Sequence, residues 1–121
     1  MNQRVAIART LIMHPRIILM DEPFGALDPG IRYQMQELLV RLWKELEATV
    51  FFITHSVEEA LFMGTKLIVM SPRPGRITHR FDLGFSTRFI NGEKARDVKA
   101  SPDFIALRER VLRIIFADEE D

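Results

Sequence analysis

The chain has 121 residues, 47% of them hydrophobic and 28% charged, which is the composition of an ordinary globular domain or of a piece of a larger one. Lysine and arginine total 17 and aspartate and glutamate also total 17, so net charge favours neither nucleic acid nor an anionic membrane as a partner. The absence of cysteine excludes disulfides and thiolate metal sites, and no apolar stretch reaches the roughly 20 residues of a membrane-spanning helix.

The first elements predicted along the chain are a helix and a buried strand. Apolar residues recur at helical spacing over residues 5–13, and Pro15 ends that helix. The run IILM at residues 17–20 is short and apolar on both faces, which is typical of a parallel strand buried on both sides. Periodicity alone leaves a buried helix open as the alternative.

Residues 24–30 form a loop rich in glycine and proline, and a helix is expected over residues 31–46. Residues 49–54 repeat the buried-strand pattern. Ser56 and Glu59 have capping-box spacing, which predicts a helix from there to about Gly64 as the C′ residue. Residues 66–70 give a third apolar strand, followed by a turn at 71–75.

The last third of the chain is less regular. Apolar and polar residues alternate loosely over residues 76–83, so we expect a strand with one solvent-exposed face. The sheet is expected to turn antiparallel at this strand. Residues 84–100 predict a long loop or a partly helical extension. Ser101 and Pro102 then begin a helix that runs to about Phe116, followed by a solvated acidic tail at 117–121.

The alternation of strands and helices predicts an α/β fold with a parallel sheet and flanking helices. Ligands bind beyond the carboxyl ends of such strands, so Asp21, Glu22 and His55 should gather on one edge. An acid pair after a buried strand suits nucleotide hydrolysis, in which the first acid holds Mg²⁺ through water and the second activates the attacking water. The alternatives are an acid pair that merely starts a loop, an ordinary loop histidine, and an Asp28 that only makes a turn before Pro29.

Four segments in one order decide between these alternatives. The run IILMDEP (17–23) resembles the Walker B strand of the ATP-binding-cassette (ABC) transporter ATPases, and GALD (25–28) resembles their D-loop. Thr54 and His55 are similar to the switch-histidine segment, and QRVAIAR (3–9) is similar to the helix that follows the signature sequence. The resemblance implies Mg²⁺ at Asp21, a catalytic base at Glu22, a γ-phosphate sensor at His55, and a contact across an ATP-sandwich dimer at Asp28.

The second half is similar to the nitrate, sulfonate and taurine importer branch, on SPRPGRI (71–77) and SPDF (101–104). This resemblance implies ATP and Mg²⁺ as cofactors, and transmembrane permease subunits and a second ATPase subunit as partners. A periplasmic or lipoprotein solute-binding protein would act indirectly, with no role for nucleic acid. The implied location is cytoplasmic, peripheral on the inner face of the cell membrane.

The chain also departs from the family pattern. Members carry a Gly-x-x-x-x-Gly-Lys-Ser/Thr phosphate loop, and no such run occurs in these 121 residues. We therefore expect an incomplete P-loop NTPase fold that lacks the phosphate-loop strand, which the family places between the strands at 49–54 and 66–70. Residues 1–83 would be the C-terminal part of the ATPase core, and 84–121 a C-terminal extension with its terminal helix.

We expect this polypeptide alone to be poorly stable, because two apolar strands would have unpaired edges. We also expect it not to hydrolyse ATP, because positioning of the phosphates supplies most of the catalysis. The leading hypothesis is thus a fragment of an importer ATPase, whose transported solute the sequence does not identify. The alternatives are a short non-catalytic protein that docks on a full-length subunit, and a gene remnant.

Overall fold

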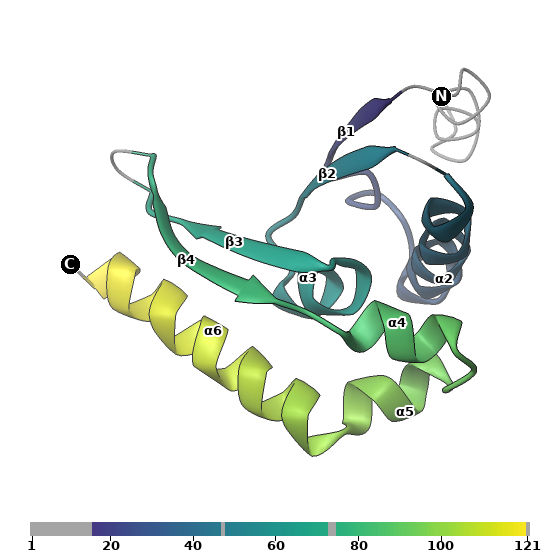
Figure 1. Cartoon of the computed structure of the whole chain (residues 1–121). Coiled ribbons are helices and arrows are strands. Elements are labelled where there is room, and N and C mark those ends of the chain that lie inside the picture. Colours follow the sequence, from purple (N-terminus) through teal and green to yellow (C-terminus); the bar gives the residue numbers. More distant parts are fainter. Residues whose placement is uncertain (1–15, 47, 73–74, 121) are drawn as a thin grey trace. The chain divides into compact units, whose positions relative to one another are not determined.

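The computed structural model describes residues 16–46, 48–72 and 75–120, and the chain divides into two compact units, Met1–His55 and Ser56–Asp121 (Figure 1). The helix expected over residues 5–13 lies outside the described residues. The described part of each unit contains a two-stranded sheet, parallel in the first and antiparallel in the second. A parallel sheet with helices confirms the mixed α/β class, whereas the missing phosphate-loop strand stays a prediction.

The first unit is a strand–helix–strand crossover. Strands β1 (Ile17–Asp21) and β2 (Thr49–Ile53) pair in parallel over their full lengths, and helix α2 (Pro29–Glu45) connects them. Parallel neighbours need such a crossover, because a tight turn can only join antiparallel strands. The register places Asp21 opposite Ile53, so both strands end at the same edge of the sheet.

Helix α2 begins where the sequence offers a helix start. Asp28 is its N-cap, with extended backbone at φ −60° and ψ 150°, and Pro29 occupies the first turn, where a missing N–H costs nothing. The ring of Trp43 meets that of Phe52 edge-on at 5.7 Å, which ties the helix to β2. The face of α2 that carries Trp43 is therefore directed at the sheet, and the buried residues of the helix are Met35, Gln36, Leu39 and Val40.

One face of the parallel sheet is covered and the other is open among the described residues. Along β1 the burial alternates, with Ile18 and Met20 buried and Leu19 68% exposed. On β2, Phe51 and Ile53 are likewise exposed. The prediction of strands buried on both sides is therefore wrong for the described structure. The physical reason is that α2, the only helix that the structure describes in this unit, can cover only one face.

The second unit consists of helices α3 (Val57–Met63), α4 (Phe85–Ile90), α5 (Ala95–Ala100) and α6 (Pro102–Glu120), with the strands β3 (Lys66–Met70) and β4 (Ile77–Asp82). Helix α3 packs against the other three helices. Aromatic pairs fill this core: the ring centroids of Phe62 and Phe89 lie 5.3 Å apart and those of Phe85 and Phe104 lie 4.9 Å apart. The fully buried side chains of this unit are Leu61, Phe62, Val98, Phe104 and Val111.

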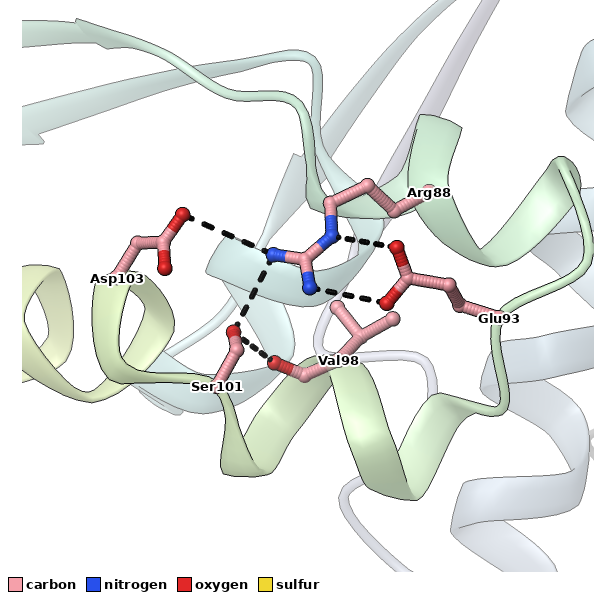
Figure 2. A network of polar contacts seen from close by, with 5 residues as sticks. All are labelled: Arg88, Glu93, Val98, Ser101 and Asp103. Atoms are coloured by element: carbon pink, nitrogen blue, oxygen red, sulfur yellow. Dashed lines mark hydrogen bonds and ion pairs between the residues drawn. The ribbon is translucent and has the colours of Figure 1, made fainter.

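A polar network around Arg88 joins the ends of α4, α5 and α6 (Figure 2). Its guanidinium donates to both carboxylate oxygens of Glu93, at 3.0 and 2.9 Å, and to the Ser101 hydroxyl at 3.3 Å. Oδ2 of Asp103 lies 3.8 Å from Nη1 of Arg88, and the Ser101 hydroxyl donates in turn to the carbonyl of Val98. The bidentate pair raises the pKa of Arg88 and lowers the pKa of Glu93.

Several predictions for this half are confirmed and others are corrected. Strands β3 and β4 pair antiparallel, as expected from the loose alternation of residues 76–83. Strand β3 is thus paired with β4 and is not part of the described parallel sheet. The Ser56 hydroxyl accepts from the N–H of Glu59, as the capping spacing predicted. Gly64 ends α3 with φ −83°, not with the left-handed backbone of a C′ residue. It is small for another reason, since a Cβ there would lie 3.0 Å from the Ala60 carbonyl oxygen.

The segment after β4 is partly helical, as predicted, through α4 and α5. Helix α6 continues to Glu120 rather than ending near Phe116, so most of the expected acidic tail is helical. The boundary between core and extension at residues 83 and 84 stays a prediction. In the part of the chain that the structure describes, no helix has the length and apolar character that a bilayer crossing needs.

Candidate active site

The acid pair lies at the end of β1, as the sequence predicted. Asp21 is the last residue of the strand and is exposed. The N–H of Glu22 donates to the Ile53 carbonyl at 2.8 Å, which extends the ladder by one residue. Glu22 then takes φ 48°, a left-handed conformation that is uncommon outside glycine. The chain thus turns sharply at Glu22, and such strained residues often occur at functional sites.

The Glu22 carboxylate is held by the backbone that follows β2. Its Oε1 accepts a hydrogen bond of 2.7 Å from the N–H of His55, and His55 Nε2 lies 3.7 Å from the same oxygen. The Glu22 side chain is 37% exposed, whereas the imidazole is 98% exposed. The main chain of His55 therefore positions the carboxylate, and its ring projects into solvent, where a ligand could meet it.

The prediction that three polar residues gather on one edge is confirmed by this geometry. Asp21 and Glu22 follow β1 and His55 follows β2, at the edge where both parallel strands end. The contact between Glu22 and His55 joins residues that are 33 positions apart in the sequence. An exposed acid, a positioned carboxylate and an exposed imidazole are the groups that general acid–base chemistry on a bound water needs.

Asp28 sits at the start of α2, but its side chain does not cap the helix. Its carbonyl accepts the N–H of Arg32 at 2.8 Å, whereas its carboxylate makes no capping hydrogen bond. The backbone of Asp28 therefore begins the helix, and the role of its carboxylate stays a prediction. The residue is exposed on the surface, and the structure describes no contact that tests a role across a dimer.

Sequence reasoning missed Arg32. Its Nη2 donates to the carbonyl of Phe24 at 2.9 Å, inside the loop that connects Glu22 to Asp28. A signal was available in the sequence, because Arg32 lies one helical turn after Asp28 and follows a loop without side-chain donors of its own. Phe24 was also left unassigned, although its ring is buried and lies 5.7 Å from that of Phe52.

The donor set of this edge fits a loosely coordinated magnesium ion better than an all-protein cage. Among the residues that the structure describes, no three His, Asp or Glu side chains are arranged to hold a metal ion. Magnesium is commonly held by one or two carboxylates together with waters and substrate phosphates. The exposed Asp21 at a strand end could supply one such carboxylate.

No family model matches the chain. It is nevertheless 58% identical, over 99% of its length, to the taurine import ATP-binding protein of Rhizobium johnstonii. The proteins of the same name from Escherichia coli and Shigella boydii are 52% and 51% identical over 98% of the chain. The chain spans about half the length of these relatives, 46% to 47%, and matches their C-terminal part. The resemblance to ABC transporter ATP-binding subunits is thereby confirmed.

Proposed function

We propose that this chain, which matches the C-terminal part of ABC transporter ATP-binding subunits, supplies the catalytic carboxylate edge of an importer ATPase for taurine or a similar small nutrient. The observation that carries the proposal is the contact of Glu22 Oε1 with the N–H of His55 at 2.7 Å. It brings together, from two parallel strands, the two residues to which the motifs assign the chemistry.

Glu22 would act as the general base on the attacking water. Its carboxylate is partly exposed and already oriented by a fixed backbone donor, so little reorganisation is needed when a water binds beside it. His55 would contact the γ-phosphate through its exposed ring. Asp21 would hold Mg²⁺ through water, and the metal would neutralise charge on the phosphates.

The proposed reaction also needs groups that hold the phosphates. The 121 residues contain no glycine-rich phosphate loop, so we propose that the chain hydrolyses ATP only when joined to a segment that provides one. Asp28 would then contact a second ATPase subunit in an ATP sandwich. Further proposed partners are transmembrane permease subunits and, indirectly, a solute-binding protein, with the ATPase on the cytoplasmic face of the membrane.

The test is a chimera in which this chain replaces the matching C-terminal part of the Rhizobium relative, to which it is 58% identical. We expect Mg²⁺-dependent ATP hydrolysis by the chimera and none by the chain alone. Glu22→Gln should lower kcat by about 10²–10⁴-fold, the usual contribution of a general base. The amide oxygen of glutamine can still accept the N–H of His55, so the fold should be retained.

Glu45→Gln, at the exposed last turn of α2, is the matched control and should leave hydrolysis unchanged. A well-folded chimera without ATPase activity would contradict the proposal and favour a non-catalytic docking protein. Hydrolysis that survives Glu22→Gln unchanged would remove Glu22 from the role of base.

A further inference from the structure

We propose that Arg32 is a positioning residue that holds the loop between Glu22 and Asp28 in its working shape. The inference rests on the proposed function, since it assumes that Glu22 acts as the base and that Asp28 contacts a second ATPase subunit. The donor is Nη2 of Arg32 on helix α2, and the acceptor, 2.9 Å away, is the carbonyl oxygen of Phe24 at the middle of the loop.

The loop has few other internal restraints. The N–H of Gly25 donates to the Glu22 carbonyl at a long 3.3 Å, and the N–H of Leu27 donates to the Phe24 carbonyl at 3.1 Å. Each bond closes only a single four-residue turn. The bond from Arg32 differs, because Arg32 lies inside helix α2 and its side chain connects that helix to the loop. It is therefore the restraint that fixes the loop against α2.

Phe24 is held from two directions. Its side chain is 1% exposed and packs on the ring of Phe52 in β2, at a centroid distance of 5.7 Å. Its carbonyl receives both the Leu27 N–H and the Arg32 guanidinium. The ring anchors the loop to the sheet and the carbonyl anchors it to the helix. Glu22 stands two residues before this anchor and Asp28 four residues after it.

The environment of Arg32 is unusual for a residue with only a surface role. Its Nε is buried and has no hydrogen-bond partner among the described residues. Burying a guanidinium nitrogen without a partner is unfavourable, and an apolar side chain of similar length would avoid that cost. An apolar side chain could not donate a hydrogen bond to the Phe24 carbonyl, and this bond is the reason we infer for an arginine at position 32.

The expected consequence concerns catalysis more than binding. A displacement of about 1 Å in a positioned group can lower a rate by about 100-fold, because phosphoryl transfer depends on alignment. Arg32 lies outside the proposed nucleotide contacts, so its loss should lower kcat and leave KM unchanged. That split would distinguish positioning from nucleotide binding.

The test begins with amide hydrogen exchange on the full chain without nucleotide. Arg32→Met should increase exchange at the Leu27 amide by about 10-fold or more, as expected when a local opening becomes easier. Amides paired between β1 and β2, such as that of Glu22, should keep their protection. Arg32→Lys retains a donor and should restore part of the protection at Leu27. Lys44→Met, which removes an exposed cation of the same helix, should change nothing.

In the chimera with the Rhizobium relative, Arg32→Met should reduce kcat by about 10–100-fold at constant KM, and Arg32→Lys should recover part of it. Unchanged exchange at Leu27 in Arg32→Met, or equal loss of protection in the strands, would overturn the inference. So would a change in KM alone. If Arg32→Met speeds exchange at Leu27 but no chimera hydrolyses ATP, the two results separate. The proposed function would be contradicted, and the positioning of the loop by Arg32 would still be supported.

Discussion

The carboxylates of Glu22 and Glu93 are held in opposite ways. In the second unit, Glu93 meets Arg88 through two hydrogen bonds, and Arg88 also reaches Ser101 and Asp103. In the first unit, Glu22 accepts one backbone N–H among the described residues, from His55. A carboxylate that is fully paired with a guanidinium serves structure, whereas one held by a single backbone donor can still take up water or a ligand.

The same contrast holds for apolar side chains. The second unit buries paired aromatic rings among four helices, with Phe62 and Phe104 at 0% exposure. The parallel sheet of the first unit leaves Leu19 68% and Phe51 53% exposed. From this difference we expect the second unit to supply most of the stability of the chain, and the first to supply the chemistry.

The largest expected effect on stability is a cavity in the second unit. Phe104→Ala removes a ring that packs edge-on against Phe85, and should lower the free energy of unfolding by about 3–5 kcal/mol. Chemical denaturation followed by circular dichroism measures this change. Phe116→Ala, in the same helix but 55% exposed, should stay within about 0.5 kcal/mol of the unchanged chain. Equal losses of unfolding free energy in the two variants would contradict the assignment of stability to the buried aromatic core of the second unit.

A smaller effect is expected on the open face of the parallel sheet. Leu19→Thr combined with Ile53→Thr replaces exposed apolar groups and keeps residues that suit a strand. Self-association measured by light scattering should fall, because exposed apolar strand faces and edges promote aggregation. The circular dichroism spectrum should not change. Ile18→Thr, on the buried face of β1, is the control and should destabilise the fold. Self-association that is the same in the double variant and in the unchanged chain would contradict the idea that the open sheet face promotes association.

The smallest expected effect is the pH dependence of the Arg88 network. The hydrogen bond with Arg88 lowers the pKa of Glu93 below its ordinary value of 4.5. A carboxylate whose pKa is lower in the folded state stabilises it above that ordinary value, and the contribution is lost as pH falls through the folded pKa. The chain should therefore be more stable than Glu93→Gln at neutral pH, by a margin that shrinks below about pH 4.5.

Thermal melts of both proteins between about pH 3 and 7 test this prediction. Arg96→Met, on the exposed side of α5, should leave the pH profile unchanged, whereas Arg88→Met should abolish the difference between glutamate and glutamine at position 93. A margin that widens as the pH falls would contradict the assigned pairing.

The sequence was sufficient for the parts that follow from topology and local chemistry. The convergence of Asp21, Glu22 and His55 follows from the rule that parallel strands end at one edge. The Ser56 cap and the change to antiparallel pairing at β4 follow from spacing and alternation, and the structure has both.

Other features depend on contacts that no local pattern encodes. The apolar runs of β1 and β2 predict burial on both faces, but burial depends on what covers a face, and α2 covers one. The bond from the His55 N–H to Glu22 joins residues 33 positions apart, and Glu22 itself takes an unusual φ of 48°. Arg32 is an ordinary basic residue of a helix until the fold brings the Phe24 carbonyl within reach.

The most direct test of the central claim compares one glutamate from each unit in the chimera with the Rhizobium relative. We expect Glu22→Gln to reduce kcat for ATP hydrolysis by about 10²–10⁴-fold, because it removes the proposed base. Glu93→Gln should leave kcat within about two-fold at neutral pH, because a surface ion pair affects stability and not the chemical step. Equal losses of activity in both variants, or a loss confined to Glu93→Gln, would contradict the assignment of catalysis to the edge formed by Glu22 and His55.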